Sequence, residues 1–232
     1  MAIVIMDSKC HQAIREQGTE DNYYGKKPGQ SKGKRLTGLR DSLGRLGHRF
    51  EIRNIEHDKI DDACVLIIAG RSAAVPFLDP ELDKIAGFSR NGGVLLMANH
   101  PGKFVQPQNQ VADRLNLAVE FLMKEGLSKK IALLPHAIST NCDELDIRRF
   151  CQMSVSPNSL TTVIAEHSNA RIGAFAVAID SEDDHSRVVA VGSSGHISSY
   201  DDKPLDLFSS KSNCTWTMNM ISWLQYADRD GA

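Results

Sequence analysis

The chain has 232 residues, and its 27 basic and 29 acidic side chains give a formal net charge of −2. That balance argues against a nucleic-acid-binding protein and against a protein held at a membrane surface. A chain of this length buries roughly 70 to 75% of its unfolded surface, so folding needs no metal or disulfide. We therefore expect one α/β domain over residues 1–232.

The cysteines and the start of the chain bear on location. The five cysteines are scattered, and none forms a Cys-x-x-Cys pair, which is typical of a reducing compartment. The apolar run over residues 2–6 is too short for a signal peptide, and no stretch approaches the ~20 apolar residues of a membrane span. The sequence therefore predicts a cytoplasmic protein.

Short apolar runs predict the strands of the N-terminal half. Runs over 2–6, 64–69 and 94–98 are continuous, as in strands buried on both faces of a parallel sheet, whereas 50–55 alternates like a strand nearer the edge. Helical spacing predicts a helix over 34–46 and another that begins at Pro80, with Asp79 as its N-cap. Strand, helix and strand in this order predict a right-handed parallel crossover.

A polar, turn-rich segment over 8–33 separates the first strand from the first helix. It is much longer than the roughly 2 to 6 residues usual in α/β domains, so we expect a long loop over the carboxyl edge of the sheet. The run from Gly29 to Arg35 does not fit a phosphate-binding loop, because the glycine spacing is too short and Arg35 replaces the Ser or Thr that would hold magnesium. A solvated loop and an anion-binding lid remain the alternatives.

The C-terminal half is less regular. We expect a helix over 110–125, a short strand over 131–134, and a closing helix over 213–226. Strands are predicted over 161–165, 174–179 and 188–191, with a hairpin whose tip is the acidic run 182–184. The segment between the strand at 131–134 and residue 159 has no assignment.

Polar residues follow four of the predicted strands. Because the carboxyl ends of parallel strands meet at one edge of a sheet, these residues predict a crevice that binds a ligand. The alternative is that short polar residues merely end strands. The candidate ligand-binding residues, with one histidine from the long loop, are Asp7, His11, Arg71, Ser72, Asn99, His100, Ser193, Ser194 and His196.

His100 is the one candidate catalytic residue. Its imidazole is suited to act as a general base or a metal ligand, with Asp7 or His196 as partner. The alternative is a histidine that only completes the turn before Pro101. The possible metal ligands Asp7, His11, His100 and His196 are dispersed and lack a short-spaced pair, so we expect no metal and no other cofactor.

Three segments together resemble the class I glutamine amidotransferase-like superfamily. They are the apolar run 65–70, the segment 81–100 with its helix, Gly92-Gly93 and strand, and the segment 187–196 followed by the closing helix. The pattern is most similar to the non-catalytic branch found in intraflagellar-transport proteins, gliding-motility proteins and uncharacterised bacterial proteins. The resemblance implies a flavodoxin-like three-layer sandwich with a mostly parallel central sheet and a late β-hairpin.

The departures from this family bear on catalysis. Active members place a cysteine nucleophile in the sharp turn after the central strand, whereas residues 97–102 of this chain contain no Cys, Ser or Thr. Ser193 also stands where relatives often carry Asp. Glutaminase or cysteine-protease chemistry is therefore not expected.

These observations lead to a functional hypothesis. We expect a catalytically inactive amidotransferase-like domain that binds a small molecule or a protein partner at the carboxyl edge of its sheet. The alternative is a hydrolase that uses His100 in the same crevice. No nucleic-acid or membrane partner is expected, and homo-oligomerisation is left open. If the domain is an interaction module, apolar residues such as Phe104 and Phe208 are expected at its surface.

Overall fold

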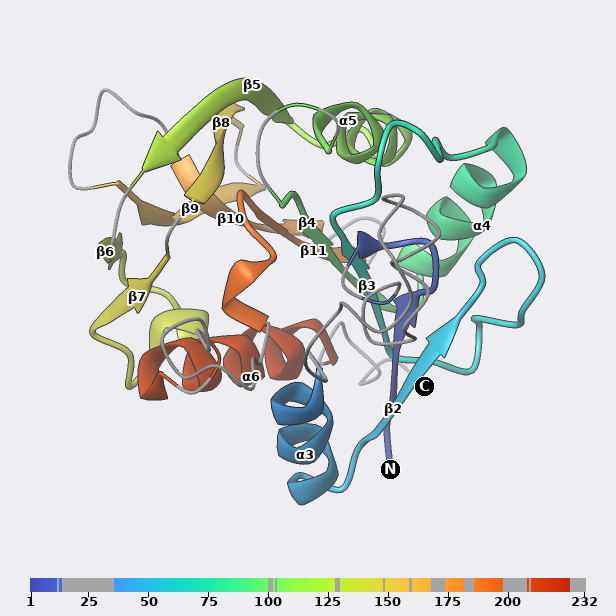
Figure 1. Ribbon diagram of the computed structural model, residues 1–232, viewed down its shortest axis with the longest axis horizontal. Coiled ribbons are helices and arrows are strands. Elements are labelled where there is room, and N and C mark those ends of the chain that lie inside the picture. Colours follow the sequence, from blue (N-terminus) through green and yellow to red (C-terminus); the bar gives the residue numbers. More distant parts are fainter. Residues whose placement is uncertain are drawn as a thin grey trace, which may run out of the picture.

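The fold is taken from a computed structural model of residues 1–232 (Figure 1). The structure describes residues 1–11, 13, 36–99, 102, 104–127, 130–147, 149–158, 160–167, 174–181, 186–197, 208 and 210–225. Most of the predicted loop over 8–33, the hairpin tip over 182–184 and His100 lie outside the described residues. None of the described helices is long and apolar enough to cross a membrane.

One half of the sheet is parallel and built from the predicted apolar runs. In spatial order the strands are β2 (Arg49–Arg53), β1 (Ile3–Asp7), β3 (Val65–Ala69), β4 (Gly93–Met97) and β11 (Ser186–Val191). Every neighbouring pair among them is parallel. All residues of β3 and β4 are buried, which confirms the prediction of central strands, and β2 lies at the edge as its alternation indicated.

The other half of the sheet is antiparallel, so the prediction of a mostly parallel sheet is wrong. From β11 the order continues through β10 (Ala174–Ser181), β9 (Thr161–Glu166), β6 (Lys130–Leu133) and β7 (Glu144–Asp146). The predicted hairpin is confirmed, because β10 and β11 pair antiparallel. Only residues 182–185 join them, which is too short for the crossover that parallel strands need.

Two further strands branch from β10. These are β8 (Arg149–Val155), which pairs with β10, and β5 (Val119–Leu127), which pairs antiparallel with β8. The unassigned region before residue 159 contributes β7, β8 and the short 3-10 helix η1 (Ala137–Ser139). A second short 3-10 helix, η3 (Gly195–Ile197), follows β11.

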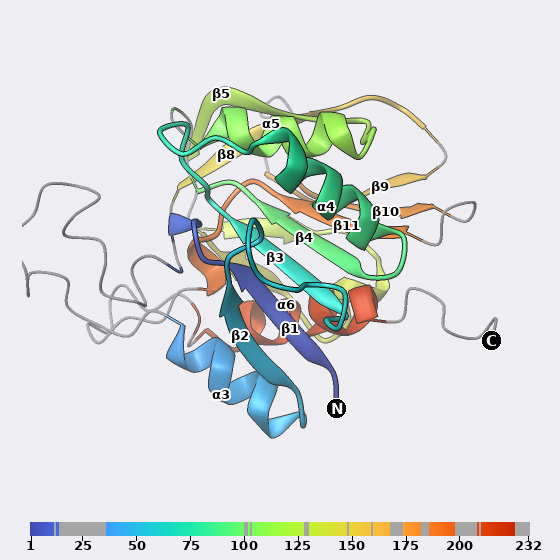
Figure 2. The ribbon, with the colours of Figure 1, turned by 90° about the vertical axis from the view of Figure 1, so that its right-hand side faces the viewer.

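In the part of the chain that the structure describes, four α-helices flank the sheet in two layers. The helices α3 (Thr37–Arg45) and α6 (Lys211–Gln225) lie on one face, and α4 (Asp79–Ser89) and α5 (Val105–Arg114) lie on the other (Figure 2). The fold is thus an α/β sandwich around a mixed sheet. The helix α4 begins one residue earlier than predicted, and Leu78 rather than Asp79 is its N-cap. The Leu78 backbone N–H donates to the Glu81 carboxylate at 2.9 Å, and the Glu81 N–H donates to the Leu78 carbonyl at 3.0 Å, so the first turn closes without the Asp79 side chain.

The predicted helix over 110–125 is wrong in its second half. The helix α5 ends at Arg114, because Asn116 takes a left-handed φ of 51° and the Leu117 N–H bonds the Ala112 carbonyl at 2.9 Å. The chain then forms β5, in which Val119 and Phe121 alternate into the core. The two predicted surface residues, Phe104 and Phe208, are also buried, because they pack among the apolar side chains rather than facing solvent.

Gly93 shows how closely α6 packs on the sheet. A Cβ at this position would lie 2.5 Å from the Leu224 Cβ and 2.6 Å from the Leu224 carbonyl oxygen, a helix backbone atom that cannot move freely. We expect Gly93→Ala to lower the free energy of unfolding by about 1 to 3 kcal/mol. The matched control is Gly87→Ala within α4, where nothing lies within 4 Å, and it is expected to stabilise by about 0.5 to 1 kcal/mol. Urea unfolding of both variants measures these changes. Equal changes in the free energy of unfolding would contradict the close packing of α6 on Gly93.

Candidate functional site

The carboxyl ends of β1, β3, β4 and β11 meet at one edge of the sheet, as their parallel pairing requires. Gly70 marks the closest approach. It has a left-handed φ of 69°, and a Cβ there would lie 2.9 Å from the Asn99 Cβ and 3.6 Å from the Ser194 hydroxyl. The structure therefore brings together polar residues that lie far apart in the sequence. Whether they bind a ligand is a separate question.

Arg71 is the centre of this edge, and it is completely buried. Its Nη1 donates to Asp7 Oδ2 at 3.3 Å and to Glu81 Oε1 at 3.0 Å, and its Nη2 donates to Glu81 Oε2 at 2.8 Å. The remaining donors reach the carbonyls of Val75 at 2.8 Å and Pro76 at 3.0 Å. All five N–H groups of the guanidinium are thus bonded within the protein, which leaves none for a ligand.

Arg71 and its charged neighbours form an ion cluster, which we define as Asp7, Lys9, Arg71 and Glu81. The ring of Phe77 packs against it. The Arg71 guanidinium lies 3.8 Å from the centre of the Phe77 ring. The Lys9 Nζ donates to Glu81 Oε1 at 3.0 Å. Lys9 Nζ also donates to Glu56 Oε2 at 2.6 Å, so it links the buried Glu81 carboxylate to a more exposed one.

Burial and pairing shift the two carboxylates in opposite directions. Burial raises the pKa of Asp7 above its usual value, although the nearby Arg71 charge opposes this. Burial also pushes the pKa of Glu81 upward, but hydrogen bonds from Arg71, Leu78 and Lys9 outweigh it and leave that pKa lowered. Such a closed cluster holds β1, the segment after β3 and α4 together. It fits a structural role better than a catalytic one.

Cys10 and His11, which follow β1 in the chain, are also buried. Cys10 accepts a bond from the Ala69 N–H at 3.1 Å, and burial raises the pKa of its thiol well above the usual value. A thiol held neutral in this way is a poor nucleophile. The His11 ring packs edge-on against Phe104, with 5.5 Å between the ring centres, and the His11 backbone N–H bonds the Gly70 carbonyl.

The residues after β3 and β11 are turned inward. The Ser72 hydroxyl accepts from the Ala74 N–H at 3.3 Å, and the Ser193 hydroxyl accepts from the Gly195 N–H at 3.2 Å. Ser194 is fully buried. These hydroxyls are placed to shape turns at the strand ends.

His196 lies in a buried aromatic environment. Its ring is edge-on to Trp216, with 5.2 Å between the ring centres, and neither ring nitrogen has a hydrogen-bond partner among the described residues. Burial lowers the pKa of His196 to about 4. His196 is therefore neutral near pH 7, and its ring nitrogens bond no carboxylate of the described residues.

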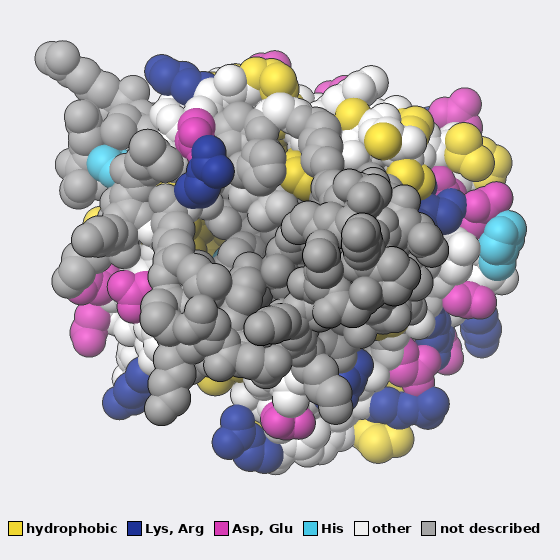
Figure 3. Space-filling view, viewed as in Figure 1, with side chains coloured by type: hydrophobic (Ala, Val, Ile, Leu, Met, Phe, Trp, Pro, Cys, Tyr) yellow, Lys and Arg dark blue, Asp and Glu magenta, His cyan; other side chains and the backbone are white. Residues whose placement is uncertain are grey.

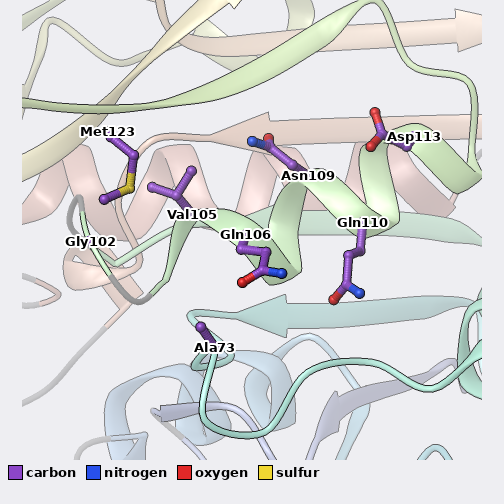
Figure 4. Close-up of a pocket in the computed structure, with 8 residues that line it drawn as sticks. All are labelled: Ala73, Gly102, Val105, Gln106, Asn109, Gln110, Asp113 and Met123. Carbon is purple, nitrogen blue, oxygen red and sulfur yellow. The ribbon is translucent and has the colours of Figure 1, made fainter.

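Two cavities lie beside the predicted crevice rather than in it. The larger, of about 680 Å³, is lined along α5 and by the segments after β3 and β4; its lining residues are Ala73, Gly102, Val105, Gln106, Asn109, Gln110, Asp113 and Met123 (Figure 4). The smaller, of about 300 Å³, is lined by Asn109, Asp113, Leu117, Ala118, Val119, Glu120, Ser154 and Ser156. The cavities share Asn109 and Asp113, and we call them together the α5 groove.

None of the eight predicted site residues that the structure describes lines the α5 groove. Sequence reasoning missed the groove because it read residues 110–125 as one amphipathic helix, which hides the exposed side chain of Met123 and the strand edge beside it. The signal for the true boundary was Asn116, a residue that tolerates the left-handed conformation and often follows the last turn of a helix. Within the described residues, no group of three or more His, Cys, Asp and Glu side chains is arranged to hold a metal ion.

Comparison with known proteins supports the fold and no specific activity. No family model matches the chain, and no curated protein matches it. Among solved structures, the mmIFT52 N-terminal domain aligns with a TM-score of 0.66 at 13% identity, covering 97% of this chain and 98% of that one. The structure of SMU.1228c aligns with a TM-score of 0.53 at 11% identity, covering 97% and 99%. The chain is thus similar in fold to an intraflagellar-transport domain, in agreement with the resemblance stated above.

Proposed function

We propose that this protein is a non-catalytic binding domain, whose ligand docks in the α5 groove beside the carboxyl edge of the sheet. The observation that carries the proposal is the contrast between two neighbouring regions. At the strand ends, the groups of the ion cluster bond to one another and His196 is enclosed beside Trp216, whereas the open cavity is lined by amides, one carboxylate and apolar side chains. Polar groups that converge beside apolar side chains are typical of ligand sites, and the described lining holds no His, Cys or Ser that could act as a nucleophile or base in the larger cavity.

The fold supports the same conclusion in a weaker way. The elbow after β4 lacks a nucleophile, and Cys10, the thiol of the strand ends, is buried and neutral. An amidotransferase-like domain without a thiolate cannot form the covalent intermediate that this chemistry needs. The similarity to an intraflagellar-transport domain is compatible with a binding role for this chain.

A ligand screen with a blocking variant tests the proposal. Gln106 is exposed on α5 and lines the larger cavity, so Gln106→Trp should fill the groove without disturbing the core. We would screen wild type by thermal shift against nucleotides, sugars, amino acids and a fragment library. A ligand at 100 times its dissociation constant adds about 2.7 kcal/mol, which raises the melting temperature by about 5 to 10 °C in a protein of this size. Gln106→Trp should abolish that shift.

The control is Asp41→Trp, which places the same side chain at an exposed position of α3, on the other face of the sheet (Figure 2). It should keep the full shift. Ligands that raise the melting temperature equally in both variants would overturn the proposed site. Turnover of ester, amide or phosphate substrates by wild type, lost in His100→Ala, would favour the hydrolase alternative instead.

A further inference from the structure

The chemistry of the α5 groove indicates what kind of ligand it holds. We infer that its occupant is an extended segment of a partner protein that carries a basic side chain and an apolar one. This inference rests on the proposed function. It goes further by specifying a peptide rather than a small molecule, and a positive rather than a negative charge on that peptide.

The first argument is the arrangement of amide side chains along α5. Gln106, Asn109, Gln110 and Asp113 stand at positions i, i+3, i+4 and i+7, so they neighbour one another along α5. Asn109 and Asp113 point toward β5, and Gln106 and Gln110 point toward the segment that carries Ala73 (Figure 4). From first to last they span about 10 Å along the helix axis, or about three residues of an extended chain. A carboxamide offers both a donor and an acceptor, as a peptide unit does.

Two of these amides already bind main-chain groups of the protein itself. Asn109 donates to the Phe121 carbonyl at 3.0 Å and accepts from the Phe121 N–H at 2.8 Å, so it pairs with both groups of one residue on the outer edge of β5. Gln110 accepts from the Phe77 N–H at 3.3 Å. Carboxamides of α5 thus pair with peptide groups in this protein, and Gln106, which is exposed and lines the larger cavity, is the amide placed to do so with a ligand.

The second argument is charge. Asp113 lines both cavities and Glu120 lines the smaller one; both carboxylates are exposed, and no Lys or Arg is among the described residues that line the groove. The neighbouring cation, Arg114, pairs with Asp83 on α4 instead. A groove of this sign attracts a lysine or arginine side chain and repels phosphate, which argues against a nucleotide or nucleic acid.

The third argument is the apolar surface at the other end of the groove. Met123 lies beside Val105 there (Figure 4), and it is 70% exposed within an irregularity of the β5–β8 pairing. Hydrophobic side chains are visible at the top and upper right of Figure 3, over α5 and the segment before α4. Flexible methionines suit contacts with an apolar side chain of a partner.

A selection from a random peptide library tests the inference. Phage-displayed random heptapeptides would be selected on the full chain, with a counter-selection on Gln106→Trp that removes peptides bound elsewhere. We expect the selected peptides to be enriched in Lys or Arg and in one apolar residue, and depleted of Asp and Glu. Fluorescence anisotropy of one labelled peptide would then measure affinity for Asp113→Asn with Glu120→Gln, a pair of changes that keeps shape and removes charge.

The double variant should bind the peptide about fivefold more weakly than wild type, or weaker still. Added salt should reduce this difference in affinity. The control is Asp41→Asn on α3, which should bind like wild type. Selected peptides that are acidic or neutral, or an affinity unchanged in the double variant, would overturn the inference while leaving the proposed groove intact. A screen that yields only small molecules sensitive to Gln106→Trp would also overturn it, because the occupant would not be a peptide. If no peptide or molecule responds to Gln106→Trp, both proposals fail.

Discussion

Replacing Arg71 with Met is expected to lower the free energy of unfolding by about 3 to 5 kcal/mol. Methionine fills much of the same volume, so the loss comes from charge rather than from a cavity. Without the guanidinium, the Asp7 and Glu81 carboxylates stay buried with Lys9 as the one cation left in the ion cluster. The carbonyls of Val75 and Pro76 lose their donors as well. Urea unfolding at pH 7 measures the effect.

The matched control is Arg49→Met at the edge of the sheet. Arg49 pairs with Glu51, but its side chain is 60% exposed, and Glu51 keeps its ion pair with Arg53 at 2.7 Å when the pair with Arg49 is broken. That change should alter the free energy of unfolding by no more than about 1 kcal/mol. If Arg71→Met costs no more than Arg49→Met, the ion cluster does not stabilise the fold in the way described. A free, ligand-binding Arg71 would then have to be reconsidered.

His196 is expected to make the protein sensitive to acid. Because burial lowers its folded-state pKa to about 4 from an ordinary value near 6.5, the folded state favours the neutral ring. The stabilisation is therefore complete above about pH 6.5 and is lost as the pH falls toward 4, since the unfolded chain binds the proton first. From pH 7 to pH 5 this one residue should lower the free energy of unfolding by about 2 kcal/mol.

The test compares wild type with His196→Phe, which keeps an aromatic ring against Trp216. Urea unfolding at pH 7, 6 and 5 should show a smaller acid loss in the variant, by about 2 kcal/mol at pH 5. Contributions from Asp7, Glu81 and the other titrating groups are common to both proteins and cancel in the difference. His57→Gln, at a side chain that is 68% exposed, is the control and should follow wild type. An acid loss as large in His196→Phe as in wild type would contradict the prediction.

The candidate site was only partly predictable from the sequence. The sequence predicts that Asp7 and Arg71 lie at one edge, because apolar runs of the right length indicate parallel strands whose ends share an edge, and in the structure Arg71 donates to Asp7 at 3.3 Å. The role of Arg71 was not predictable in the same way. Its main partner, Glu81, lies in the first turn of a helix, and its sequence position gives no sign that the side chain is buried. Only the packing of α4 on the sheet brings that carboxylate to the guanidinium.

The α5 groove depends still more on long-range structure. Its lining joins α5, the segment after β3 and the strand β5, and β5 is held there by pairing with β8, a strand in the region left without assignment. Antiparallel pairing between residues that lie 22 (Leu127 and Arg149) to 36 (Val119 and Val155) positions apart leaves no local periodic signal. The same limitation explains the error over residues 119–125. There, Leu122 and Met123 happen to continue the helical spacing of the apolar residues before them, although they lie in a strand.

What the sequence determined by itself is the parallel half of this protein: the buried strands β1, β3 and β4, the helices that connect or cover them, and the meeting of their polar ends. These features follow from local hydrophobic patterning and from the handedness of short crossovers, both of which act over a few tens of residues. Only the tertiary structure decided that the polar ends are closed into an ion cluster, and that the open cavity lies along α5. Those outcomes depend on which distant groups come within hydrogen-bonding distance, and burial then decides whether a charge is free to bind or already paired.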